Sequence, residues 1–164
     1  MATPTSLPAT FVAGNVLTAA QMNNLRGAFR ILQVVRATDT TERATTSTSV
    51  IDVPGMSVTI TPTSADSDII IMATGYVTTV PDSFPYIRVI MTDSSNVAIS
   101  GGEQIKWGAG TVASENGLVM VGYDSPATTS ATTYKLRFRS EGGQTVRFRN
   151  NVTTGQMFAF EVSA

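Results

Sequence analysis

Apolar and polar residues alternate with a period of two along much of this chain, most clearly near the C-terminus. Tyr134, Leu136 and Phe138 alternate with basic residues, and a second run, 146–149, repeats the pattern. Because successive side chains of a strand point to opposite faces, this pattern predicts strands with one buried face and one basic face. The intervening residues 141–143 are short enough to join the two strands as a hairpin.

The basic side of this predicted hairpin is a candidate docking face for an acidic protein partner. A three-residue loop keeps apolar residues opposite apolar ones, whereas a two-residue loop mixes the faces. That register would gather five cations on one surface: Lys135, Arg137, Arg139, Arg147 and Arg149. Opposed like charges cost up to about 1 kcal/mol per pair unless water or an anion relieves them. The alternative interpretation is an ordinary solvated strand face.

Short strand-forming runs recur between turn signals from residue 31 onward. The predicted strands are 31–38, 50–53, 57–62, 68–77, 86–93, 103–107, 117–124, 132–141, 145–150 and 156–163. Turns are expected at 54–55, 62–68, 93–96 and 100–102, and a polar edge or loop at 38–49. The last strand is expected to bury Phe158, Phe160 and Val162. Many short strands predict an all-β protein, an antiparallel, jelly-roll-like β-sandwich over residues 31–164.

Residues 1–30 differ from the rest and predict an extended arm followed by one short α-helix. Proline and glycine disfavour a helix over 1–17, whereas Thr18 and Gln21 have the spacing of a capping box that starts a helix near Ala19. The helix is too short to be stable alone, so its apolar stripe should pack on its own domain or on copies of the chain. The candidate attachment and oligomer-interface residues are Leu7, Phe11, Val12, Leu17, Met22, Leu25, Phe29 and Leu32.

The amino-acid composition argues against several classes of function. The chain has 164 residues, 14% of them charged, with a formal net charge of -1. Nucleic-acid binding needs an excess of cations, so we expect no such partner. The absence of cysteine and histidine removes the commonest ligands and proton shuttles, and we expect no metal, no cofactor and no enzymatic activity. We also expect no membrane span and no secretion signal, hence synthesis in a cytoplasm.

Two smaller motifs contain residue types that can bind a ligand. Trp107 precedes Gly108 and Gly110 and could stack on a sugar ring of a glycan, although a lone tryptophan is more often part of a core or interface. Asp66 and Asp68 could share a calcium ion, but the further oxygen ligands of a calcium loop are missing, so a simple turn is expected.

The segment 11–23, Phe-Val-Ala-Gly-Asn-Val-Leu-Thr-Ala-Ala-Gln-Met-Asn, resembles the leading segment of a widespread family of bacteriophage virion structural proteins. Members are described as tail-fibre, minor tail or head-decoration proteins. Further likeness lies in 31–35, 45–49, 57–62 and 124–134. The resemblance implies a compact β domain, often a homotrimer, tethered to the particle through its N-terminus. It implies no catalytic residues.

These observations predict a virion structural protein that is assembled in the host cytoplasm and displayed on the particle surface. The favoured role is a head decoration or cement protein, held by its arm to a major capsid or tail protein and trimeric with its own copies. A tail-fibre or receptor-binding tip, with Trp107 against a host surface glycan, is the first alternative. A carbohydrate-binding module or enzyme is the second.

Overall fold

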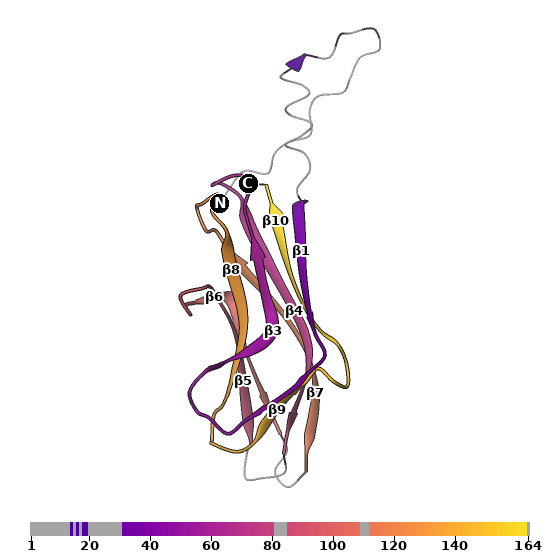
Figure 1. Cartoon of the computed structure of the whole chain (residues 1–164), viewed down its shortest axis with the longest axis vertical. Coiled ribbons are helices and arrows are strands. Elements are labelled where there is room, and N and C mark those ends of the chain that lie inside the picture. Colours follow the sequence, from indigo (N-terminus) through magenta and orange to yellow (C-terminus); the bar gives the residue numbers. More distant parts are fainter. Residues whose placement is uncertain are drawn as a thin grey trace.

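The structure is a computed structural model that describes residues 31–80, 85–108 and 112–163, together with positions 14, 16, 18 and 19. The described residues form ten strands, and the long strands run along the length of an elongated body (Figure 1). These strands are β1 (Ile31–Asp39), β2 (Glu42–Thr45), β3 (Ile51–Ile60), β4 (Asp68–Thr79), β5 (Tyr86–Thr92), β6 (Ala98–Trp107), β7 (Ser114–Asp124), β8 (Thr132–Ser140), β9 (Val146–Arg149) and β10 (Gly155–Val162).

The strands follow one antiparallel order, β1-β10-β4-β7-β6-β5-β8-β3. The order folds over between β7 and β6, where the ladder is reduced to Ser100 opposite Tyr123. We call β1, β10, β4 and β7 the first layer and β6, β5, β8 and β3 the second layer. The short strands β2 and β9 pair with each other, and β9 extends the first layer along β4. Each layer interleaves strands from distant parts of the chain, which is the jelly-roll topology.

The two ends of the strand order lie against one another, so the sheet nearly closes. At the upper end, Gln33 Nε2 in β1 donates a hydrogen bond to the Thr61 carbonyl oxygen beyond β3, at 2.6 Å. Near the middle, Arg43 of β2 donates to the Pro54 carbonyl oxygen of β3 at 3.4 Å. These side-chain bonds link the two ends of the strand order, where β1 and β3 each pair through the backbone with one other strand.

The core lies between the layers and is built from alternate residues of every long strand. Its largest fully buried side chains are Tyr134, Phe138, Phe148, Met56, Ile60, Ile69, Ile71, Ile87, Met91, Leu118, Met120 and Leu136. The rings of Phe138 and Phe148 meet edge to face across the layers, with centroids 5.7 Å apart. Burying one such side chain contributes roughly 1.5–3 kcal/mol. The all-β sandwich expected from the sequence is therefore confirmed.

The predicted pairing of β8 with β9 is wrong. β8 pairs with β3 and β5, whereas β9 pairs with β2 and β4. The loop between them crosses from one layer to the other, and the Glu141 amide donates to the Tyr86 carbonyl oxygen while the Val80 amide donates to the Thr145 carbonyl oxygen. The alternation did identify the buried faces correctly, because Tyr134, Leu136, Phe138, Val146 and Phe148 are all fully buried.

Two predicted turns are irregularities inside strands. β3 runs through Pro54 and Gly55, where the register shifts and Gly55 has φ +90°. A Cβ on Gly55 would lie 3.0 Å from the Asp39 side chain, so both the positive φ and the close approach favour glycine at this bulge. β6 likewise runs through 100–102, with Gly101 at φ +72°. The segment 38–49, expected to be a loop or edge, contains the short strand β2.

The arm and helix predicted for residues 1–30 fall almost wholly outside the described residues, and the division between them and the β domain stays a prediction. Of the candidate attachment residues, the structure places Leu32 alone, on β1 with a partly exposed side chain. Leu7, Phe11, Val12, Leu17, Met22, Leu25 and Phe29 lie outside the described residues. Within the described part of the chain, no helix is long and apolar enough to cross a membrane.

Candidate interaction surface

The first layer is apolar on its outer side as well as on its core side. Along β4, Ile69 and Ile71 enter the core while Ile70 and Met72 point outward. β7 and β10 likewise carry apolar side chains on both their core side and their outer side. We call the outward set the apolar outer face, and its members are Val34, Ile70, Met72, Val119, Val121, Tyr123, Phe158 and Phe160.

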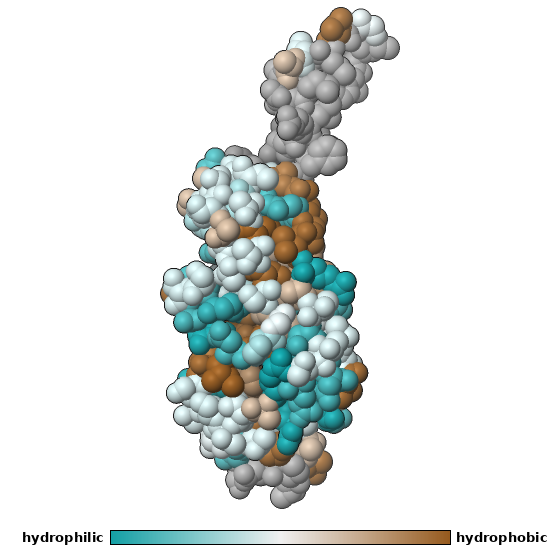
Figure 2. Space-filling view, in the orientation of Figure 1, coloured by the Kyte–Doolittle hydropathy of each residue, from teal (hydrophilic) through white to brown (hydrophobic). Residues whose placement is uncertain are grey.

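The strand register aligns these side chains in rows across the layer, because residues paired across a ladder point to the same side. The upper row is Val34, Phe160, Ile70 and Tyr123, and the lower row is Arg36, Phe158, Met72 and Val121. The rings of Phe158 and Phe160 stack with centroids 5.9 Å apart. In Figure 2, hydrophobic atoms gather over the upper ends of β1 and β10.

The charged groups around this face form hydrogen bonds with polar side chains at its borders. Arg36 lies 5.6 Å from the centroid of the Phe158 ring and donates to Gln156 Oε1 at 2.8 Å. At the upper border, Ser125 donates to Asp68 Oδ1 at 2.6 Å. At the lower border, the Tyr76 hydroxyl donates to Glu115 Oε2 at 2.6 Å. The middle of the face, as far as the structure describes it, carries apolar groups only.

The paired groups at the lower border have shifted pKa values. A hydrogen bond from Arg147 is the main cause that lowers the pKa of Glu42, against the smaller effect of desolvation. The hydrogen bond to Glu115 raises the pKa of the Tyr76 hydroxyl. Both shifts stabilise the charge state that is already present at neutral pH, so these groups are structural rather than poised for proton transfer.

An antiparallel sheet that faces water on one side alternates apolar with polar residues, so apolar residues on both faces indicate that both are covered. Large contiguous apolar patches on a protein surface mark contacts with proteins or membranes, or ligand-binding grooves. The sequence contains a signal for strands that are apolar on both faces, in the unbroken apolar runs 69–72, 118–121 and 157–160. Sequence reasoning missed it because it assigned one buried face to each strand.

The predicted orientation of the last strand is wrong, and the error concerns this surface. Phe158 and Phe160 point outward, whereas Met157, Ala159 and Glu161 point into the core and are fully buried. Glu161 accepts hydrogen bonds from the Thr63 amide at 2.6 Å and the Thr63 hydroxyl at 2.7 Å. Polar partners brought from a distant loop thus make an inward carboxylate tolerable.

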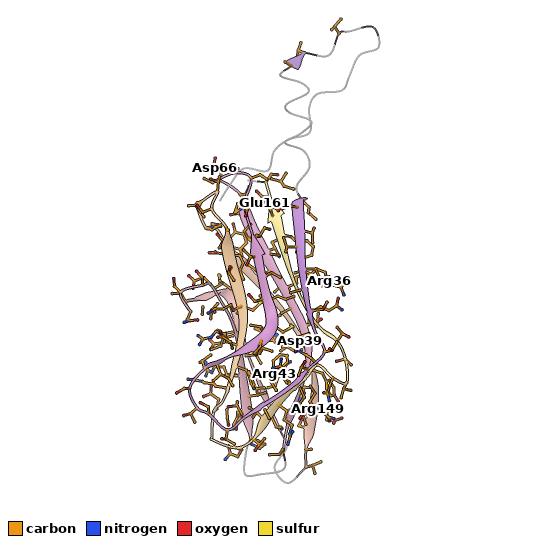
Figure 3. All side chains as sticks on the ribbon, in the orientation of Figure 1. Arg36, Asp39, Arg43, Asp66, Arg149 and Glu161 are labelled. Carbon is orange, nitrogen blue, oxygen red and sulfur yellow. The ribbon has the colours of Figure 1, made fainter. Side chains whose placement is uncertain are left out.

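A second set of bonds completes the surroundings of Glu161, which is labelled at the upper end of β10 in Figure 3. Gln33 Nε2 donates to Glu161 Oε2 at 2.7 Å. Burial raises the pKa of Glu161, but the hydrogen bonds from Thr63 and Gln33 outweigh it and hold the pKa below its usual value. The ionised carboxylate therefore ties β10 to β1 and to the loop after β3.

The basic residues expected on one surface lie on two. Three of them project from β8 on the outside of the second layer, and each faces an acid. Arg137 Nε lies 2.6 Å from Asp52 Oδ1, Lys135 Nζ lies 3.7 Å from Asp52 Oδ2, and Arg139 Nε lies 2.9 Å from Glu141 Oε1.

The other two basic residues, Arg147 and Arg149, project from β9 on the outside of the first layer. Arg147 pairs with Glu42, and Arg149 lies 3.6 Å from Glu42 and 3.4 Å from Glu115. Because β8 and β9 bury their apolar sides against each other, their cations must point in opposite directions. The prediction of a single five-cation face is therefore wrong.

The remaining candidates add no chemistry to the described part of the chain. Its residues contain no group of three or more acidic, histidine or cysteine side chains that could hold a metal ion. Asp66 lies in an exposed turn, as expected. Trp107 ends β6 opposite Tyr86, but its side chain lies outside what the structure describes, so the glycan contact stays a prediction. Buried Asp39 accepts a hydrogen bond from Asn150 at 2.9 Å, a structural link between β1 and the turn after β9.

No family model matches the chain, and no curated protein matches it. Among solved structures, that of infectious bursal disease virus Gx strain is similar with a TM-score of 0.46 and 12% identity, and covers 80% of this chain and 32% of that chain. A mutant VP2 protein of the same virus, from derived T=1 particles, is similar with a TM-score of 0.38 and 13% identity, covering 80% of this chain and 36% of that one. The chain thus spans about a third of the length of either, at 32% and 36%.

Proposed function

We propose that this chain is a structural protein of a bacteriophage virion, displayed on the particle surface and held there by its N-terminal arm. The observation that carries the proposal is the leading segment 11–23, which resembles that of phage virion proteins and stands directly before a jelly-roll domain. Jelly rolls are common in capsid proteins and lectins. The apolar outer face supports a role in protein contact, and the proposal includes no catalytic activity.

Within this class we favour a head decoration or cement protein. The arm carries Leu7, Phe11 and Val12 among small and polar residues, a composition suited to wrapping a neighbouring protein. Ordering such an arm costs conformational entropy, and repeated attachment through several linked copies offsets that cost. The compact domain after it would then cover the shell between attachment points.

The decisive test is a protein inventory of purified phage particles with copy number. A head decoration protein should be present in many copies, in a fixed ratio to the major capsid protein. A few copies per particle would instead support the tail-fibre or receptor-binding tip. Absence from particles would contradict the whole proposal.

A second test addresses the arm. Deletion of residues 1–17 should abolish binding to particles that lack the protein, while the thermal unfolding of the β domain stays unchanged. The matched control replaces Thr3 and Thr5 by alanine, which alters the arm without removing its apolar residues. If the shortened protein still bound particles, the arm would not be the tether.

A further inference from the structure

We propose that the buried carboxylate of Glu161 is an acid-sensitive latch, which holds the upper end of the contact between β1 and β3 closed while it is ionised and lets that end open when it is protonated. We call this contact the seam. In the described part of the chain, the seam is where the two ends of the strand order lie against one another without pairing through the backbone. The latch concerns the β domain alone and does not depend on a role in a virion.

β1 contributes little apolar surface to the seam. Its inward side carries Val35 and Ala37, both only partly buried, between the polar residues Gln33 and Asp39. Its pairing with β10 is also irregular at the upper end, where the register shifts between Ile31 and Gln33. One valine and one alanine contribute less burial than the large side chains of the core. The seam therefore depends on polar bonds at the two ends of this inward row.

At the upper end, these bonds converge on Glu161 of β10, which is fully buried. From the loop after β3, the Thr63 amide and hydroxyl donate to Glu161 Oε1 at 2.6 Å and 2.7 Å. From β1, Gln33 Nε2 donates to Glu161 Oε2 at 2.7 Å and to the Thr61 carbonyl oxygen at 2.6 Å. One carboxylate thus binds donors from both sides of the seam.

The donors that hold Glu161 are uncharged, and the charged groups on the neighbouring elements lie elsewhere. On β1, Arg36 projects to the outer side, and β3 has no charged residue over 56–60. Asp68 begins β4 at the border of the apolar outer face, and Asp66 lies in the exposed turn before it. A carboxylate held by amide and hydroxyl groups loses its charge-assisted bonds on binding a proton, because a neutral acid is a weaker acceptor and brings a donor of its own.

A second buried carboxylate secures the seam lower down, and there a cation stands beside it. Asp39 at the end of β1 accepts a hydrogen bond from Asn150 at 2.9 Å, lies 3.6 Å from Arg43 and sits beside Gly55 of β3. Figure 3 shows Glu161 near the upper end of the body and Asp39 close to Arg43 lower down. Because different chemistry holds the two levels, we expect the upper end to open while the lower end stays closed.

The pH range of the latch follows from its surroundings. Burial raises the pKa of Glu161, but the hydrogen bonds from Thr63 and Gln33 outweigh it, so the folded pKa lies below the usual 4.5. The latch is closed above about pH 4.5 and opens as pH falls through the folded pKa.

The first experiment measures hydrogen exchange of the full chain by NMR at about pH 6 and about pH 3, with rates corrected for the intrinsic pH dependence of exchange. The Thr63 amide and the Gln33 side-chain amide, which both donate to Glu161, report on the two sides of the latch. The β4–β7 ladder around Ile71 and Gly122 reports on the whole fold. We expect protection of both latch reporters to fall at least about tenfold at the lower pH while the ladder stays protected.

Two results of this experiment would overturn the proposal. Unchanged protection of the Thr63 and Gln33 reporters at the lower pH would show that the proton does not open the seam. An equal loss of protection in the β4–β7 ladder would show that acid unfolds the domain as a whole rather than opening one end of it.

The second experiment removes the charge at neutral pH. Glu161→Gln changes the size of the side chain little, and should lower the protection of the Thr63 amide at least about tenfold and abolish its pH dependence. The matched control is Asp68→Asn, an acid at the same end of the body that bonds to Ser125 outside the seam, and it should keep Thr63 protected. Full protection in Glu161→Gln, or equal loss in the control, would contradict the latch. The acid titration needs no variant, so it decides the question even if Glu161→Gln does not fold.

Discussion

The outer sides of the two layers differ in the side chains that they present to solvent. On the first layer, the apolar outer face presents valine, isoleucine, methionine, phenylalanine and tyrosine side chains that gain nothing from water. On the second layer, the outward residues of β8 and its neighbours form ion pairs with each other. The charged side chains of the second layer are thus paired within the chain, whereas the apolar side chains of the first layer's outer side remain partly exposed.

The ion pairs of the second layer form a connected group around Glu141. Arg88 pairs with Glu141 and lies 2.5 Å from Glu103, and Arg139 lies 2.9 Å from Glu141. Burial raises the pKa of Glu141, but hydrogen bonds from Arg88 and Arg139 outweigh it and lower the pKa. Hydrogen bonds to Glu103 and Glu141 raise the pKa of Arg88. Cations already bound in this way are poorly available to an acidic partner.

The largest expected effect concerns the core that both layers share. Phe148→Ala removes a fully buried ring that meets Phe138, and should lower the free energy of unfolding by about 3–5 kcal/mol. Phe158→Ala removes an outward ring and should cost clearly less in the monomer. Chemical denaturation at a concentration where both variants are monomeric measures the difference. Equal losses would contradict the assignment of Phe158 to the outside.

The next effect concerns the carboxylate behind the apolar outer face. Glu161→Gln should lower the free energy of unfolding at neutral pH by about 1–3 kcal/mol, because the Thr63 and Gln33 donors lose a charged acceptor. The pKa of Glu161 is lowered in the folded protein from its usual 4.5. Its stabilising contribution is therefore complete above about pH 4.5 and is lost as pH falls through the lower folded pKa.

Unfolding measured from neutral to acidic pH checks this sign. The unchanged protein should lose stability below about pH 4.5, and Glu161→Gln should lose less over the same range. Glu103→Gln serves as the control, because its exposed carboxylate pairs with Arg88 on the outside of the second layer. A pH profile of Glu161→Gln identical to that of the unchanged protein would exclude the carboxylate as the cause.

A smaller effect tests whether the basic residues lie on two surfaces. Arg137→Glu and Arg147→Glu should each cost up to about 1 kcal/mol, because each breaks a partly exposed ion pair. Since the residues are on opposite outer sides, their costs should add within about 0.5 kcal/mol in a double-mutant cycle. Coupling well above that value would support the paired hairpin instead.

The smallest expected effect is the change in the free energy of unfolding when a side chain of the apolar outer face is replaced. Val121→Thr and the control Val152→Thr should each change the free energy of unfolding by no more than about 0.5 kcal/mol. Both valines are half exposed at 53% in the single chain, so little burial is lost. A loss above about 1 kcal/mol for Val121→Thr alone would mean that the face contributes to the folding of the single chain.

The sequence predicted much of the fold because its signals are local. Alternation in 134–138 and 146–148 identified which side chains are buried, and nearly every predicted strand is present. The glycines at 55 and 101 were recognised as special positions but were assigned to turns. A positive φ shows that the backbone bends, and bulges and turns share that requirement.

The candidate site was predicted less well because it depends on distant residues. In β10, the two phenylalanines look like the core row, since hydrophobicity alone favours burying them. The core instead takes Met157, Ala159 and Glu161, and the carboxylate is accepted because Thr63 and Gln33 arrive from other strands. No local pattern in 156–163 contains those partners.

The sequence by itself determined the strand period, the position of the breaks and the all-β class, because these follow from residues that are neighbours along the chain. The tertiary structure decided which strands lie side by side, which layer β8 and β9 join, and which side of β10 faces out. A period of two defines two faces but does not say which is inside, and only long-range packing makes that choice.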